Sequence, residues 1–331
     1  IRRDGSLTVT SGQTRHKLIE VPGGGPFTFR GEYNGGLPLS LGQVFKLRTQ
    51  TKTFFAEVIE DNGVKAVAAA YQDYWHAALL NPEKRHEVEA ELIGLLREII
   101  ALNDIGEEGD ASVFISEAEL KRLQRKPGKA TEEDRMAVSI RLIPWIEKRG
   151  YQALTGRTSP LLELMLWRES RHEEQDVELT DGVVTVPVTY LEGFISSGWS
   201  YFATLDRART GGWTKADGIY VVSGAYPDKT AESFTISYMK HEARHFVDAT
   251  RYPNISSADR EYRAKLTELV YVQGRMRHLL GIFATQRARV DIPHTLANWQ
   301  VTQDLAERLY DGKAPENWWS SVEPERVREA A

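Results

Sequence analysis

The chain has 331 residues, which is enough for one large domain or two of ordinary size. Its 41% of hydrophobic and 27% of charged residues are typical of a soluble globular protein. The net charge of −5 argues against a nucleic-acid partner, because a phosphate-binding surface normally shows as a basic excess. No apolar run approaches the ~18–20 residues that span a bilayer, so we expect no transmembrane segment.

Cysteine is absent from the sequence, which excludes disulfides, thiolate nucleophiles and zinc bound by cysteine. Histidine and carboxylate side chains are then the remaining candidates for metal ligands. The first residue is Ile1 rather than Met, and no signal-like apolar segment follows it. We expect a protein that a bacterium exports to the periplasm or the medium. The composition leaves its oligomeric state open.

The first half of the chain divides into two predicted regions. Residues 1–60 are predicted to be irregular and β-rich, because short runs such as Ser6–Thr10 and Phe27–Gly31 lie among glycine turn signals. Residues 61–157 are predicted to be helical, because apolar side chains recur there at helical spacing. The predicted helices of this region cover about 64–81, 88–102 and 132–153.

Residues 158–331 mix strand and helix signals. The apolar run Leu161–Trp167 predicts a short helix, and the turn dipeptide Asp181-Gly182 before the β-branched run Val183–Tyr190 predicts a hairpin. Gly218–Val222 predicts a further strand. Three longer helices are predicted at about 231–250, 258–280 and 296–310. The chain as a whole is therefore predicted to be α+β, with a mainly helical N-terminal region before a region that contains a small antiparallel sheet.

Five residues in the first of these helices, His241-Glu242-Ala243-Arg244-His245, match the pattern H-E-x-x-H. Residues four apart project from the same helix face, so both imidazoles can reach one ion about 2 Å away. The intervening glutamate can take a proton from water at that ion. Neither Gly nor Pro interrupts residues 231–249. The motif predicts that His241 and His245 bind Zn²⁺ and that Glu242 is a general base.

A catalytic zinc needs a third protein ligand and an open position. The longer three-histidine pattern requires Gly at position 248 and His at position 251, and the chain has Asp248 and Arg251, which excludes it. A glutamate from the following helix is the alternative. Glu261 and Glu268 both qualify, because they lie one heptad apart on the same helix face, with the small Ala264 between them.

Residues 218–268 resemble the active-site core of gluzincin zinc metallopeptidases, with a strand, the motif helix and a glutamate helix in that order. Glu261 followed by Ala264 is similar to the third-ligand segment of several of these families, which favours Glu261. Lys265 stands where those families often have Asp, so Glu268 stays an alternative. The resemblance implies a zincin-like fold and implies that Gly218–Val222 is the edge strand that pairs with an extended peptide.

The expected activity is hydrolysis of a peptide or protein substrate. The tetrahedral oxyanion of such a reaction needs a donor besides the metal, and His294 and Tyr271 are candidates from their positions in the sequence. Asp248, one turn beyond His245, is a candidate for orienting a ligand imidazole. Two alternatives stay open: a zincin-like binding or scaffold protein without activity, and a zinc hydrolase with a non-peptide substrate.

Overall fold

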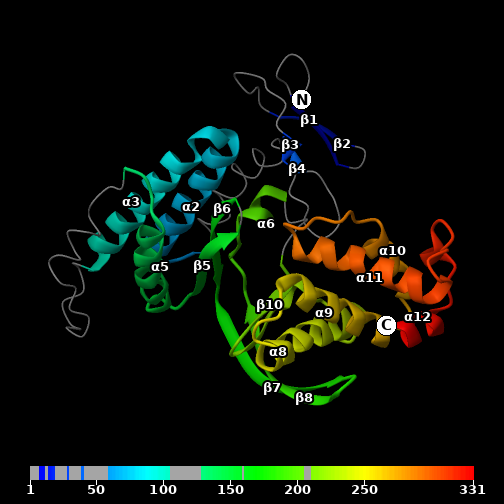
Figure 1. Ribbon diagram of the computed structural model, residues 1–331. Helices are drawn as coiled ribbons and strands as arrows, with labels where there is room; N and C mark the ends of the chain where they lie inside the picture. The colour runs from blue at the N-terminus through cyan, green and yellow to red at the C-terminus, as the bar shows by residue number, and fades with distance from the viewer. Residues whose placement is uncertain are drawn as a thin grey trace. The chain divides into compact units, whose positions relative to one another are not determined.

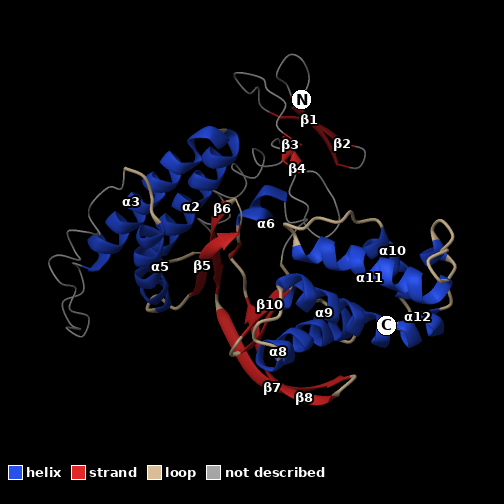
Figure 2. Cartoon of the chain, viewed as in Figure 1, coloured by secondary structure: helices blue, strands red, loops and turns tan. Residues whose placement is uncertain are grey.

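The computed structural model describes residues 59–104, 128–158, 160–204 and 210–331, together with four short strands nearer the N-terminus (Figure 1). The chain divides into two compact units, each built from two segments: 1–169 with 193–209, and 170–192 with 210–331. Both units combine helices with small sheets (Figure 2), so the α+β prediction is confirmed. No helix among the described residues is long and apolar enough to cross a membrane.

The four N-terminal strands form two antiparallel pairs. These strands are β1 (Leu7–Ser11), β2 (Thr14–Leu18), β3 (Thr28–Phe29) and β4 (Leu39–Ser40). The other residues up to 58, on which most of the prediction for residues 1–60 falls, lie outside the described residues.

The first unit packs helices against a three-stranded sheet of order β5-β6-β9. Its helices are α2 (Asn62–Leu80), η1 (Pro82–Lys84), α3 (Arg85–Asp104), α5 (Glu132–Glu147) and α6 (Trp199–Thr204), and its strands are β5 (Gln152–Thr158), β6 (Leu161–Trp167) and β9 (Ser196–Ser197). Helix α2 is tied to β6 at one residue: the Trp75 indole donates to the Leu162 carbonyl at 2.7 Å, and the Leu162 N–H donates to the Tyr74 hydroxyl at 3.1 Å. The two side chains of α2 thus satisfy the backbone carbonyl and N–H of Leu162, in a strand that is fully buried.

Two predictions for this part of the chain are wrong. Leu161–Trp167 is the strand β6 rather than a short helix, and all seven of its residues are buried. A short run that is apolar at every position does not distinguish a buried strand from a buried helix by periodicity. The helix predicted over 132–153 ends at Glu147, and the chain then enters strand β5 at Gln152.

The second unit contains a four-stranded sheet of order β10-β11-β8-β7. Its strands are β7 (Glu169–Leu179), β8 (Gly182–Glu192), β10 (Gly212–Lys215) and β11 (Gly218–Val222). The predicted turn at Asp181-Gly182 joins β7 to β8, with Gly182 at φ 126°. Strand β11 pairs with β8 in parallel and with β10 antiparallel. The predicted edge strand Gly218–Val222 is therefore internal, and β10 forms the edge.

The second unit also contains helices, and those between residues 232 and 251 pack on one face of this sheet (Figure 1). The helices of the unit are η2 (Ser223–Ala225), α7 (Glu232–Phe234), the π-helical segment η3 (Thr235–Lys240), α8 (His241–Arg251), α9 (Ser257–Tyr271), α10 (Met276–Ala284), α11 (Pro293–Tyr310), η4 (Trp318–Ser320) and α12 (Pro324–Ala330). The predicted helix 231–250 thus has a π-helical turn directly before the motif, and the predicted helix 258–280 is two helices. Phe234, Tyr238 and Met239 pack against the sheet.

Candidate metal centre

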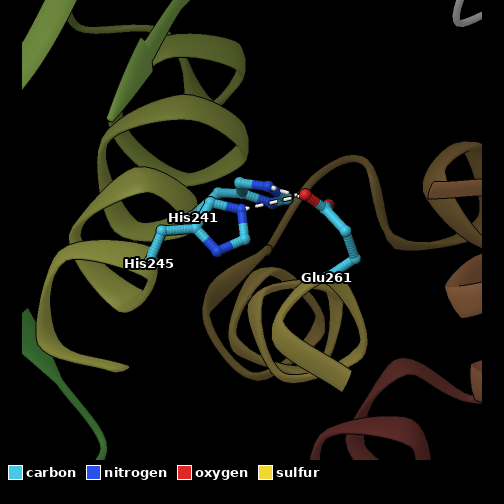
Figure 3. Close-up of side chains that lie close together, drawn as sticks. All are labelled: His241, His245 and Glu261. Carbon is cyan, nitrogen blue, oxygen red and sulfur yellow. Dashed lines mark ion pairs between the residues drawn. The ribbon is translucent and has the colours of Figure 1, made fainter. Parts of the chain in front are cut away.

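The two motif histidines lie on one face of α8, in its first and second turns. The helix is continuous from His241 to Arg251, and the imidazole centroids of His241 and His245 are 4.6 Å apart. Ala243, which is fully buried, packs against the sheet on the opposite side of the helix. The apolar side of α8 therefore fixes the helix, and its imidazoles turn toward α9 (Figure 3).

Helix α9 brings Glu261 to the two histidines. Ser256 caps this helix by accepting from the Asp259 N–H at 3.1 Å. Ala264, one turn after Glu261, is completely buried, so α8 and α9 can approach closely. Glu261 Oε1 lies 3.2 Å from His245 Nε2, and Glu261 Oε2 lies 3.4 Å from His241 Nε2 (Figure 3).

The spacing of these atoms is close to that of metal ligands. Bonds of about 2.05 Å at tetrahedral angles separate neighbouring ligand atoms by about 3.3 Å. The two contacts, each to a different oxygen of Glu261, are 3.2 and 3.4 Å, and one ligand atom from each of the three residues lies within 4.8 Å of the others. The side chains of His241, His245 and Glu261 are only 7, 11 and 12% exposed. The three residues form a buried group that could hold a metal ion. Two imidazoles and one carboxylate suit Zn²⁺ and several other divalent transition metals.

Glu268 takes a different position from Glu261. Its Oε1 lies 2.7 Å from His241 Nδ1, on the side of the imidazole opposite the cluster, and it also accepts from Lys265 Nζ at 3.0 Å. Glu268 is 1% exposed. Of the two glutamates that the sequence leaves open, Glu261 joins the histidine pair, and Glu268 holds His241 from behind with its Nε2 toward the cluster.

The charges of this group depend on one another. Burial alone would lower the pKa of His241, but the carboxylates of Glu261 and Glu268 outweigh burial and raise it to about 9. Burial would raise the pKa of Glu261, but the adjacent imidazoles of His241, His245 and His294 hold it far below its usual range. Burial would likewise raise the pKa of Glu268, but Lys265 and His241 outweigh burial and lower this pKa to about 2. Both carboxylates are therefore ionised at neutral pH, and their charges are balanced by His241 and Lys265.

Glu242 is held by the edge strand of the sheet. The Thr214 hydroxyl of β10 donates to Glu242 Oε2 at 2.7 Å and lies 3.2 Å from the Glu242 carbonyl oxygen. Thr214 thereby fixes one oxygen of the carboxylate that follows His241 in the motif. Sequence reasoning did not identify Thr214. The sequence marks Thr214 only by its hydroxyl, in the short segment before the predicted strand Gly218–Val222.

Asp248 does not orient a ligand imidazole. It is completely buried, and it accepts from Arg263 Nε at 2.7 Å and from Arg263 Nη2 at 3.1 Å. His245 Nδ1 has no hydrogen-bond partner among the described residues. The Asp248–Arg263 pair instead ties α8 to α9, one turn beyond the cluster.

The two candidates for an oxyanion donor lie in different places. His294, in the first turn of α11, lies with Nδ1 2.8 Å from Glu261 Oε2, and its side chain is 50% exposed. Tyr271 lies ten residues after Glu261, which is about 15 Å along a helix axis. Its ring contacts Lys240 Nζ, 3.7 Å from the ring centroid. Only His294 is in contact with the cluster.

No protein-family model, curated protein or solved structure matches this chain. The geometry of the cluster and its neighbours therefore carries the functional argument by itself.

Proposed function

We propose that the chain is a zinc-dependent metallopeptidase of gluzincin type, with its catalytic machinery in the second unit. The main support is the buried group of His241, His245 and Glu261, which could hold a metal ion. The helix of the two histidines also carries the motif glutamate Glu242, whose carboxylate Thr214 binds. A zincin-like arrangement is supported by the antiparallel edge strand β10 against the motif helix and by the glutamate helix packed on the other side.

The residues have distinct roles in this proposal. His241, His245 and Glu261 bind the metal, and Zn²⁺ in such a site lowers the pKa of water toward ~7 and polarises a carbonyl group. Glu242 accepts a proton from the attacking water and passes it to the leaving amine as the C–N bond breaks. His294 donates to the oxyanion from the half-exposed side of its ring.

Peptide is the preferred substrate class because an unpaired strand edge lies at the proposed base. Among the described residues no strand pairs with the outer side of β10, and β10 carries the threonine that binds Glu242. An extended peptide can add to such an edge by backbone hydrogen bonds. Its carbonyl groups would then run past Glu242.

Metal content and hydrolysis test the proposal together. We expect one zinc per chain in the wild type and in Glu268→Ala, and strong loss of zinc in Glu261→Ala, because only Glu261 is in the ligand group. Glu242→Gln should keep zinc and abolish cleavage of a protein substrate. Wild-type protein without stoichiometric zinc would refute the metal site. Zinc-loaded protein that cleaves no peptide would refute the peptidase and leave the scaffold or a non-peptide hydrolase.

A further inference from the structure

The edge strand β10 has two different faces. The Thr214 side chain points toward α8, where it binds Glu242. Because side chains alternate along a strand, Trp213 and Lys215 lie on the opposite face of the sheet. A peptide strand added to β10 would therefore present alternate side chains to the catalytic helix and to these two residues.

The backbone of β10 fixes where such a strand would bind. The Val222 N–H donates to the Gly211 carbonyl at 3.0 Å, so Gly211 points its carbonyl group inward, toward β11. Along an antiparallel strand, alternate residues direct their backbone N–H and C=O groups to opposite sides. The N–H and C=O groups of Gly212 and Thr214 therefore point outward, away from β11. The Thr210 hydroxyl already binds both the N–H and the carbonyl of Gly212, at 3.2 and 3.0 Å. An incoming strand is thus centred on Thr214.

The ring of Trp213 is placed to meet this strand. Trp213 lies opposite Tyr220 of β11, and the two rings are stacked, with centroids 5.6 Å apart and an angle of 9° between their planes. One face of the indole is covered by Tyr220. Because Tyr220 lies on the inner strand, the other face is turned toward the outer edge of β10, and the side chain is only partly buried.

Lys215 carries the second recognition element. It is exposed, and its ammonium group lies 4.8 Å from the centroid of the Tyr220 ring, on the same face of the sheet as Trp213. A substrate residue opposite Lys215 in the non-hydrogen-bonded position would have its side chain close to this charge. An acidic side chain is the one that such a neighbour favours.

We infer that Trp213 and Lys215 select the substrate residues on either side of the one that faces the catalytic helix, so that the preferred sequence is acidic–X–aromatic. X pairs with Thr214 in an antiparallel strand, the preceding acidic residue pairs with Lys215, and the following aromatic residue stacks on Trp213. This selection rests on the proposed peptidase function, since it concerns the substrate of the same site.

A peptide series with full-length, zinc-loaded protein tests the inference. The peptides carry Phe or Ser at the position opposite Trp213, and Glu or Lys at the position opposite Lys215. Aromatic stacking predicts a kcat/KM that is about two- to tenfold higher for Phe than for Ser, mainly through KM. Trp213→Ala should remove this preference, Trp213→Phe should keep it, and Lys215→Glu should turn the preference for Glu into one for Lys.

A control and two opposing outcomes complete the test. Trp299, which is 39% exposed on α11, provides the matched control, because Trp299→Ala removes an indole away from β10 and should leave both preferences unchanged. If the wild type cleaves peptides but Trp213→Ala lowers kcat/KM equally for Phe and Ser, and Lys215→Glu changes nothing, the selection is refuted and the peptidase stands. If the zinc-loaded wild type cleaves no peptide, both the substrate selection and the peptidase function are refuted.

Discussion

The buried carboxyl of Glu163 makes the stability of the first unit depend on pH. Glu163 is 8% exposed in strand β6. Burial raises its pKa from 4.5 to about 7, against the opposing effect of a hydrogen bond from the Trp199 N–H at 2.6 Å. The neighbouring glycine, Gly198, leaves room for the carboxyl, because a Cβ there would lie 2.2 Å from Glu163 Oε1. We expect Glu163→Gln to remove this pH dependence.

The sign and the size of the effect come from linkage. Below pH 4.5 the carboxyl is protonated in both the folded and the unfolded chain, and the stability is complete. Between pH 4.5 and 7 only the folded chain keeps the proton, so stability falls as pH rises. At about 1.36 kcal/mol per pKa unit, the loss for Glu163 is about 3 kcal/mol by pH 8, as an order of magnitude.

Hydrogen exchange of β6 amides at pH 5 and pH 8, corrected for the intrinsic exchange rate, measures this loss where it arises. The wild type should lose about 2.5 kcal/mol more protection over this range than Glu163→Gln does, because part of the loss has already occurred at pH 5. The exposed residue Glu169 supplies the control, since Glu169→Gln should behave as the wild type. Identical pH dependence in the wild type and Glu163→Gln, or greater wild-type protection at pH 8, would refute the reasoning.

Three further predictions concern the second unit. Glu268→Gln should weaken zinc affinity about 10- to 100-fold in a chelator competition, because His241 loses a charged acceptor; equal affinities would contradict it. Thr214→Val should lower kcat about tenfold with zinc content unchanged, because Glu242 loses its donor, and Thr214→Ser should restore it. Gly212→Ala should lower the melting temperature by several degrees, since φ is 146° and a Cβ would lie 2.0 Å from a backbone oxygen. Its control lies in strand β5 of the first unit: Gly156→Ala, where a Cβ meets nothing within 4 Å, should have little effect.

The sequence predicts the members of the cluster better than their arrangement. The spacing in H-E-x-x-H places His241 and His245 on one face, and the structure agrees. The heptad between Glu261 and Glu268 puts both glutamates on one helix face, but it does not show that His241 would lie between them. The Glu261 carboxylate contacts Nε2 of His241, and the Glu268 carboxylate contacts Nδ1 of the same ring. This assignment depends on the packing of two helices, which periodicity does not specify.

The identity of the edge strand was the main error about the sheet. Gly218–Val222 contains Ile219, Val221 and Val222, all of them buried, and a nearly continuous apolar run is typical of a strand with neighbours on both sides. That signal was present in the sequence. Strand β10, with only four residues and an initial glycine, gives almost no periodicity by itself. Its place at the edge results from pairing with β11, which is a tertiary property.

The π-helical segment Thr235–Lys240 determines how the chain tolerates a change in length. Each residue added to or removed from an α-helix rotates all later side chains by about 100° about the helix axis. A π turn contains one such extra residue, and wide turns of this kind are frequent at functional sites. With it, Phe234 faces the sheet while His241 faces α9. Deleting one residue from the segment would leave a regular helix whose imidazoles are out of phase with Glu261, a shift that no side-chain substitution could imitate.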